Sequence, residues 1–112
     1  MLKGLSISKT MSSAIELVGK PSFSNKIINY WEINEAFAAQ FLAVNRDLKL
    51  DLHNVNRHGS GISLRHPAGA TGARLLVTLL HELKRSGERY GCATLCAGGG
   101  PGAAMIVENM QL

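Results

Sequence analysis

The sequence predicts an α/β domain in which helices are layered against a mixed sheet, and three features indicate this fold class. Residues 27–33 are rich in β-branched and aromatic side chains, which strands favour. Residues 34–48 and 67–86 repeat apolar side chains every three or four positions, which is the period of an amphipathic helix. Residues 91–97 and 103–107 are apolar runs on either side of a glycine-rich loop, a pattern typical of adjacent strands. Strands interleaved with helices predict a sheet covered by helices.

Length and composition restrict the classes of protein that this chain can represent. With 112 residues, of which 46% are hydrophobic and 18% charged, it is long and apolar enough for one compact domain. Its two cysteines, Cys92 and Cys96, cannot form a disulfide framework. A reducing compartment such as the cytoplasm is therefore expected, with an organelle as the open alternative. No run approaches the roughly 20 apolar residues of a membrane-spanning helix, so no membrane association is expected.

The basic excess lies mainly in the first 29 residues. The net charge is +4, and residues 1–29 hold four Lys and one Glu. This leader is poorly patterned apart from a short helix-like stretch at residues 13–18, so the organised domain is expected at residues 30–112. The longest basic run in the domain is Lys84-Arg85. That run is too short for the basic stripe of a nucleic-acid-binding surface, so no nucleic-acid partner is expected.

The first helix is predicted to follow the strand at residues 27–33. Asn34 stands where the apolar period changes from that of a strand to that of a helix, and Asn is a good N-cap residue. The expected apolar face of this helix consists of Phe37, Phe41, Val44 and Leu48.

The second helix is predicted to begin beyond Pro67. It carries Lys84 and Arg85 in its last turn, where cations suit the helix dipole, and Gly87 follows as a left-handed cap. Residues 59–64, which precede it, contain two glycines and are predicted to form a loop with a short strand. The expected apolar face of the helix consists of Leu76, Leu79, Leu80 and Leu83.

Three polar residues, Asn34, His66 and Cys96, stand at the ends of predicted elements, where sites of α/β proteins assemble. Each also has a structural interpretation: Asn34 as a helix cap, His66 as a surface histidine and Cys96 as a small buried side chain. The three glycines after Cys96 favour a site, because they let the backbone approach a ligand. His53, His58 and His81 have no ligand-like spacing with either cysteine, so no metal site is expected.

Three blocks of sequence carry a family resemblance. They are WEINEAFA at residues 31–38, VN at 55–56 with GSGISLRHPAGATG at 59–72, and CAGGGPG at 96–102. In order and spacing they resemble the C-terminal domain of the thiolases. The resemblance covers about residues 30–108, whereas residues 1–29 resemble the family poorly.

The resemblance implies the fold of a thiolase C-terminal half and an acyltransferase activity. Thiolases interconvert two acyl-CoA molecules, such as acetyl-CoA, with a 3-oxoacyl-CoA and free CoA, a Claisen condensation of lipid metabolism. Cys96 would be the acid/base that moves the α-proton of the second acyl thioester. His66 would polarise that thioester oxygen and help activate the nucleophilic cysteine. Asn34 would hold a water at the same oxyanion site.

The resemblance also implies contacts with the substrate. The backbone N–H of Gly98 would belong to a second oxyanion hole, and Ala36 and Phe37 would line the pocket near the thioester. Coenzyme A thioesters would be substrates, and no cofactor is expected.

Two departures from the family pattern bear on activity. Arg65 stands where the family usually has Gly before the His-Pro pair. The acyl-carrying cysteine of thiolases lies in an N-terminal domain that this chain lacks, and Cys92 matches a core position instead. We therefore expect an N-terminal thiolase domain or a second subunit as partner, in a homo- or hetero-oligomer. The alternative is a truncated, non-catalytic thiolase-fold module with residual acyl-CoA or subunit binding.

Overall fold

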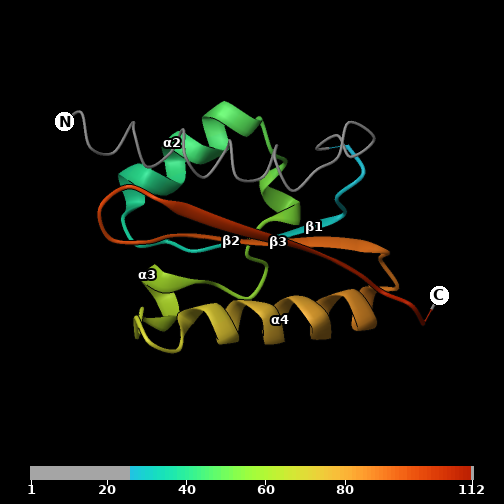
Figure 1. Cartoon of the computed structure of the whole chain (residues 1–112). Helices are drawn as coiled ribbons and strands as arrows, with labels where there is room; N and C mark the ends of the chain where they lie inside the picture. The colour runs from blue at the N-terminus through green and yellow to red at the C-terminus, as the bar shows by residue number, and fades with distance from the viewer. Residues whose placement is uncertain (1–25, 112) are drawn as a thin grey trace.

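The computed structural model describes residues 26–111, and the predicted leader at residues 1–29 lies almost wholly outside them (Figure 1). The described chain alternates strands and helices as an α/β domain does. In order, its elements are β1 (Tyr30–Ile33), α2 (Ala38–Leu48), the 3-10 helix η1 (Leu52–Asn54), α3 (Gly61–Leu64), α4 (Thr71–Ser86), β2 (Tyr90–Cys96) and β3 (Gly102–Glu108).

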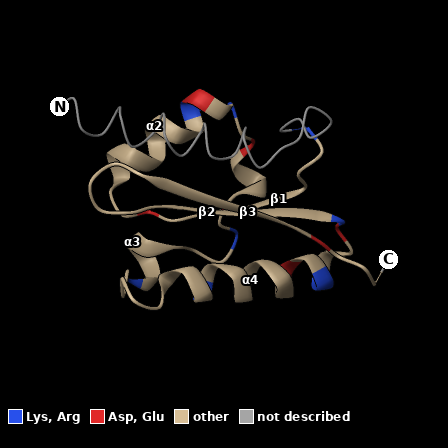
Figure 2. Cartoon of the chain, in the orientation of Figure 1, with Lys and Arg blue, Asp and Glu red and all other residues tan. Residues whose placement is uncertain are grey.

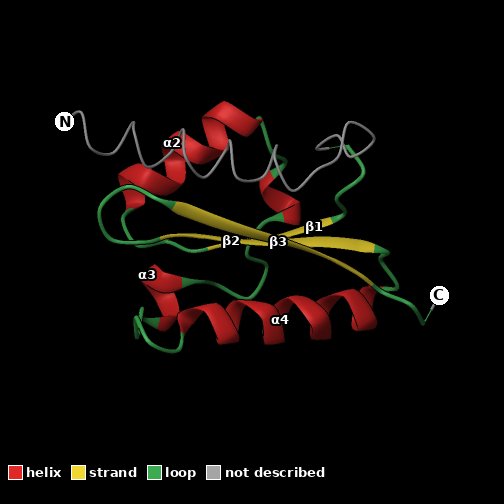
Figure 3. Cartoon of the chain, in the orientation of Figure 1, coloured by secondary structure: helices red, strands yellow, loops and turns green. Residues whose placement is uncertain are grey.

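The three strands form the mixed sheet that the sequence predicts. Their order is β1-β2-β3, with β1 parallel to β2 and β2 antiparallel to β3. The helices lie on both sides of this sheet: α2 and η1 on one face, α3 and α4 on the other (Figure 3). The α/β fold class is thus confirmed. No helix in residues 26–111 is long and apolar enough to span a bilayer.

Alternate residues of the strands supply two separate core clusters. Trp31 and Cys92 belong to the cluster that packs against α2, whereas Tyr30 and Ala93 belong to the cluster that packs against α4. Side chains of a strand point alternately to the two faces of its sheet. Both faces of β1 and of the middle of β2 are buried, which explains why apolar side chains stand at successive positions and not only at alternate ones.

The first helix begins later than predicted, and the proposed cap at Asn34 is wrong. The N-cap is Phe37, and Asn34 instead extends the sheet, because its N–H donates to the carbonyl of Thr94 at 2.9 Å. Val44 and Leu48 are buried as expected. Phe37 does not belong to the buried face, because its position before the first turn leaves it 68% exposed.

Within residues 59–64, Gly61–Leu64 form the short helix α3, where a loop with a short strand was predicted. The prediction was based on the two glycines within the segment, but whether a segment forms a strand also depends on a pairing partner elsewhere in the chain. Only Val55, just before this segment, makes an isolated bridge, to Trp31, among residues 26–111.

The second helix ends where predicted, at Ser86, and Gly87 caps it in the left-handed region with φ 68°, but it begins only at Thr71, four residues beyond Pro67. Its buried face contains Leu75, Leu79 and Leu83, spaced four apart. The prediction for Leu80 is wrong, because Leu80 is 52% exposed. The buried side of the helix instead includes Glu82, whose side chain is 1% exposed.

The buried carboxylate of Glu82 is paired with two arginines and a histidine. Arg57 and His58 contact it at 2.8 Å and Arg85 at 2.7 Å. Hydrogen bonds, first of all from Arg85, lower the pKa of Glu82 to about 2. Figure 2 shows acidic and basic positions together towards the C-terminal end of α4. This cluster attaches the segment after η1 to α4.

Gly91 allows α4 to pack closely on β2, and we predict that Gly91→Ala destabilises the domain. A Cβ at this position would lie 2.5 Å from Cδ1 of Leu79 and 3.0 Å from Cδ1 of Leu83. Both leucines are fully buried, so we expect a loss of about 1–3 kcal/mol in the free energy of unfolding, measured by urea denaturation.

Gly72→Ala is the matched control for this substitution. Gly72 lies in the first turn of α4, and the nearest atom to its added Cβ would be Cδ1 of Leu95 at 4.0 Å. Because Ala favours helices, this variant should be as stable as the wild type or up to about 1 kcal/mol more stable. Equal stability of Gly91→Ala and the wild type would contradict the packing argument.

Candidate functional site

The candidate site lies at the edge of the sheet where β1 and β2 both end. The carboxyl ends of parallel strands meet at one edge, and Asn34 follows β1 while Cys96 is the last residue of β2. The turn that leaves β2 contains Gly99 and Gly100 at φ 93° and 111°, and the N–H of Ala97 donates to the carbonyl of Pro101 at 2.9 Å. Glycine is needed at these two positions because other residues rarely adopt such angles.

The side chain of Asn56 fixes the end of β1. Its Oδ1 accepts from the N–H of Ile33 at 2.8 Å, and its Nδ2 donates to the carbonyl of Ile33 at 2.9 Å and to Glu35 Oε1 at 3.2 Å. The N–H of Asn56 also donates to the carbonyl of Trp31 at 2.9 Å. Asn56 therefore pairs with the exit of β1 much as a neighbouring strand would.

The start of α3 packs directly against the backbone that follows β1. Ser60 Oγ donates to the carbonyl of Ile33 at 3.0 Å. A Cβ at Gly61 would lie 2.6 Å from the carbonyl oxygen of Glu35 and 3.1 Å from Oδ1 of Asn34. Only glycine permits this approach, and the result is that Asn34 is fully buried.

His66 lies in the loop between α3 and α4, with a hydrogen-bond partner on each side of its ring. Nε2 is 3.3 Å from Nδ2 of Asn34, and Nδ1 is 2.6 Å from Oγ1 of Thr71. Thr71 Oγ1 in turn donates to the carbonyl of Pro67 at 2.9 Å. The imidazole itself is exposed to solvent, so its orientation depends on these contacts.

The predicted site residues meet around one cavity of about 380 Å³. Its lining consists of Ala36, Phe37, His66, Cys96, Ala97, Gly98 and Gly99. Asn34 is not part of the lining; it lies next to His66 and contacts its Nε2. The structure thus brings a thiol, an imidazole and glycine backbone groups together, as acid/base chemistry needs. The roles assigned to these residues remain predictions.

The two cysteines lie in different environments. Cys92 is 0% exposed in the cluster between the sheet and α2, and burial raises the pKa of its thiol to about 12. Cys96 is half-buried and borders the cavity. The prediction that Cys92 occupies a core position is confirmed.

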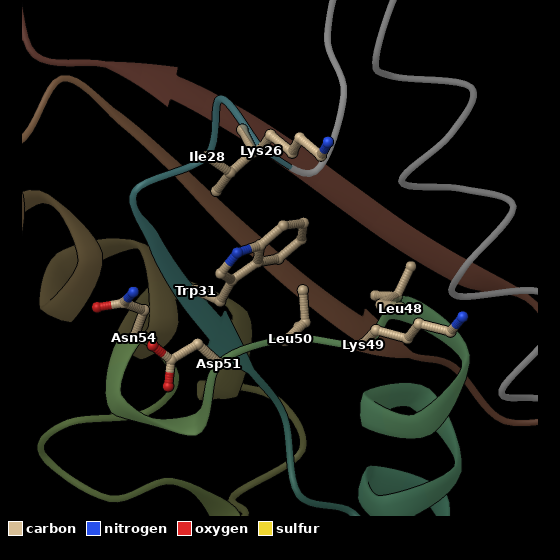
Figure 4. Close-up of a pocket in the computed structure, with 8 residues that line it drawn as sticks. All are labelled: Lys26, Ile28, Trp31, Leu48, Lys49, Leu50, Asp51 and Asn54. Atoms are coloured by element: carbon tan, nitrogen blue, oxygen red, sulfur yellow. The ribbon is translucent and has the colours of Figure 1, made fainter.

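A larger hollow of about 440 Å³ is formed by β1 and the segments from the end of α2 to η1, away from these residues (Figure 4). Trp31, Lys26 and Lys49 are among its lining residues. None of the predicted site residues belongs to it. Within residues 26–111 no group of three or more His, Cys, Asp or Glu side chains could hold a metal ion, and the expectation of a site without metal remains a prediction.

Sequence reasoning assigned no role to Asn56, Ser60, Gly61 or Thr71, although all four hold the site together. They lie inside the sequence blocks quoted above. Their roles depend on contacts with residues 5 to 27 positions away, such as Asn56 with Ile33, which one sequence does not reveal.

The chain belongs to the thiolase family: the family model of the thiolase C-terminal domain matches residues 5–109. This match confirms the resemblance. It begins at residue 5, within the leader that the sequence analysis separated from the domain at residues 1–29. The boundary predicted at residue 30 remains a prediction.

Individual relatives agree with this assignment. An acetyl-CoA acetyltransferase of Escherichia coli (strain K12) is 46% identical over 110 residues, which are 98% of this chain and 27% of that protein. One of Shinella zoogloeoides is 58% identical over 79 residues, or 70% of this chain and 20% of that protein.

Solved structures show the same fold. Human mitochondrial 3-ketoacyl-CoA thiolase in complex with CoA matches 95% of this chain and 27% of its own, with a TM-score of 0.88 and 40% identity. The Bacillus anthracis acetyl-CoA acetyltransferase matches with a TM-score of 0.86 and 48% identity, over 91% of this chain and 26% of its own. The chain therefore spans about a quarter of the length of these relatives.

Arg65 adopts a backbone conformation that suits glycine, and we predict that Arg65→Gly stabilises the domain. Its φ is 73° with ψ 165°, a region that costs other residues about 1–3 kcal/mol. Part of this gain is offset because glycine loses more conformational entropy on folding. We therefore expect the free energy of unfolding to rise by about 1 kcal/mol, measured by thermal or urea denaturation. Arg65→Ala is the control, because it removes the guanidinium but keeps the strained Cβ. If Arg65→Ala stabilised the domain as much as Arg65→Gly, the strain would not be the cause.

The two thiols should differ in reactivity towards an alkylating reagent. We predict that iodoacetamide modifies Cys96 in the native chain and reaches Cys92 only in denaturant, because a buried thiol with a raised pKa forms little thiolate. Intact-mass and peptide mass spectrometry measure the two sites separately. The Cys96→Ser variant should remain unmodified under native conditions. Native labelling of Cys92 at the rate of Cys96 would refute the assignment of Cys92 to the core.

Proposed function

We propose that this chain supplies the acid/base half of a thiolase-type acyltransferase site, which interconverts two acyl-CoA molecules, such as acetyl-CoA, with a 3-oxoacyl-CoA and free CoA. The observation that carries the proposal is the meeting of Cys96, His66 and Gly98 at one cavity, with Asn34 held against His66. The names of the relatives support the same chemistry, since they are acetyl-CoA acetyltransferases and a 3-ketoacyl-CoA thiolase.

In the proposed condensation, Cys96 acts on the second acyl-CoA. Its thiolate removes a proton from the carbon next to the thioester carbonyl, and the electron pair of that C–H bond moves into an enolate. The enolate carbon then attacks the acyl group carried on the nucleophilic cysteine, forming a C–C bond and releasing that cysteine's sulfur. In the reverse direction the Cys96 thiol returns the proton to carbon.

The other residues stabilise negative charge that develops on oxygen. His66 faces the enolate oxygen from the α3–α4 loop, Asn34 next to it holds a water at the same oxyanion site, and the N–H of Gly98 serves the oxyanion of the acyl group under attack. Ala36 and Phe37 form the apolar wall of the cavity, which favours the thioester end of a substrate over water. Each of these assignments is part of the proposal.

The nucleophilic cysteine comes, in this proposal, from outside the 112 residues. Cys92 does not fit that role, because its thiol is buried and its pKa is raised. An N-terminal thiolase domain or a second subunit, in a homo- or hetero-oligomer, would supply it. We further propose a cytoplasmic location, acyl-CoA thioesters as substrates with no separate cofactor, and no nucleic-acid or membrane partner.

A chimeric enzyme tests this function. Joining the chain to the N-terminal portion of the Escherichia coli relative should give an enzyme that consumes a 3-oxoacyl-CoA in the presence of CoA, followed by absorbance. Cys96→Ala and His66→Ala should each lower kcat by roughly 100-fold or more, the usual contribution of an acid/base group. Cys92→Ala, the matched cysteine control, should retain activity.

Two outcomes would contradict the proposal. One is a folded chimera, verified by circular dichroism, that turns over no substrate. The other is activity that survives in Cys96→Ala. Binding of acetyl-CoA by the chimera without turnover would favour the alternative of a non-catalytic module.

A further inference from the structure

We propose that Arg74 is a positioning residue that holds the peptide unit between Arg65 and His66 against α4. The carbonyl of Arg65 stands directly before His66 in the chain, and Nη1 of Arg74 donates to it at 2.5 Å. The meaning of this contact for catalysis rests on the proposed function, whereas the contact itself can be tested without any activity.

The backbone on the C-terminal side of His66 is attached to the start of α4. The carbonyl of Pro67 accepts from the N–H of Ala70 at 2.8 Å and from the N–H of Thr71 at 2.9 Å. Proline itself has no N–H, and it restricts the residue before it to an extended backbone. The peptide unit between His66 and Pro67 therefore has no donor, and the nearest complete peptide unit on the N-terminal side is the one that contains the Arg65 carbonyl.

The conformation of Arg65 shows why this peptide unit needs a partner. Its φ is 73° and its ψ 165°, a region that strains every residue except glycine. A strained residue stays in such a conformation only where surrounding contacts hold it. The hydrogen bond from Arg74 is a contact of this kind, because it fixes the carbonyl whose direction the ψ angle of Arg65 sets.

Arg74 can hold this carbonyl because its own side chain is partly enclosed. It lies three residues after Thr71, the first residue of α4, so the two side chains leave the same side of the helix. Its Nη2 is buried, without a hydrogen-bond partner among residues 26–111. Burial raises the pKa of Glu32 on β1 to about 7, and the positive charge of Arg74 opposes that rise, which places the guanidinium near the sheet. The guanidinium is therefore not a freely moving surface cation.

Arg74 and Thr71 together hold His66 at two points. Thr71 Oγ1 contacts Nδ1 of the imidazole at 2.6 Å, while Arg74 holds the backbone from which the imidazole extends. The imidazole is exposed, so a shift of its backbone would move it relative to Cys96, which borders the same cavity. A misplacement of about 1 Å can lower the rate of an enzyme on the order of 100-fold. Arg74 would thus act on the reaction through His66, without touching the substrate.

Nitrogen-15 NMR of the full 112-residue chain tests the contact directly. In the wild type, the side-chain N–H groups of Arg74 should exchange with water more slowly than those of Arg46, which is exposed on α2. The amide nitrogen of His66 belongs to the same peptide unit as the bonded carbonyl, and hydrogen bonds along such a chain polarise one another. Arg74→Met should therefore shift the His66 amide signal, whereas Arg46→Met, the matched arginine control, should leave it in place.

The kinetics of the chimera test the positioning role. Arg74→Met should lower kcat roughly 10- to 100-fold with little change in KM, because the substrate still binds but meets a displaced His66. Arg74→Lys should recover most of the lost kcat, because its ammonium can still donate to the carbonyl. Arg46→Met should keep the kcat of the unmodified chimera.

The contact is refuted if the side-chain N–H groups of wild-type Arg74 exchange as fast as those of Arg46, a result that needs no variant to fold. It is also refuted if folded Arg74→Met leaves the His66 amide signal unchanged. In an active chimera, unchanged kcat in Arg74→Met, an increase in KM alone, or no recovery in Arg74→Lys would overturn the positioning role. An inactive chimera together with the expected NMR results would refute the proposed function and leave the attachment of the loop by Arg74 intact.

Discussion

The hydrogen bonds between the Asn56 amide and the backbone of Ile33 are the constraint on which the site depends. β1 is four residues long, and its last residue would otherwise leave an N–H and a carbonyl without strand partners on the edge away from β2. Asn56 is the partner of the N–H and shares the carbonyl with Ser60 Oγ, and an unpaired buried polar group costs more than a single hydrogen bond contributes. The position of Asn34, the next residue, follows from this pairing.

The residue after Asn56 connects the same segment to the other layer. Arg57 donates through its guanidinium to Glu82 near the end of α4 and to Glu88 just after it, and through its backbone N–H to the Tyr30 hydroxyl in β1. Two adjacent residues therefore hold β1 and α4 relative to each other. Asn34 follows β1 and Thr71 is the first residue of α4, and His66 contacts both. The separation of these two contacts therefore depends on how β1 and α4 are attached to each other.

Patterns within one element were predictable, and contacts between elements were not. The strands at 91–97 and 103–107 and the helix ending before Gly87 follow from local period and turn residues, and the structure agrees. Asn34 has the residue type of a cap, but its backbone pairs with Thr94, sixty positions away. The helix α3 was not predicted for a similar reason, because Ser60 and Gly61 at its start contact Ile33 and Glu35, which lie more than twenty positions away. The motif blocks indicated where the site lies. They did not reveal the hydrogen bonds between Asn56 and Ile33 or the contact between Thr71 and His66.

The site residues differ in exposure in a way that bears on the chemistry. Asn34 and Thr71 are fully buried, Cys96 is half-buried, and His66 and Phe37 are exposed. The orienting groups are thus buried, whereas His66 faces open solvent, where hydrogen bonds to a developing oxyanion are weak. Acyl transfer of the proposed kind needs that side to be closed, because water weakens the donors and hydrolyses the acyl intermediate. The proposed partner that brings the nucleophile would meet this need as well, since it would approach the same open face to reach the substrate.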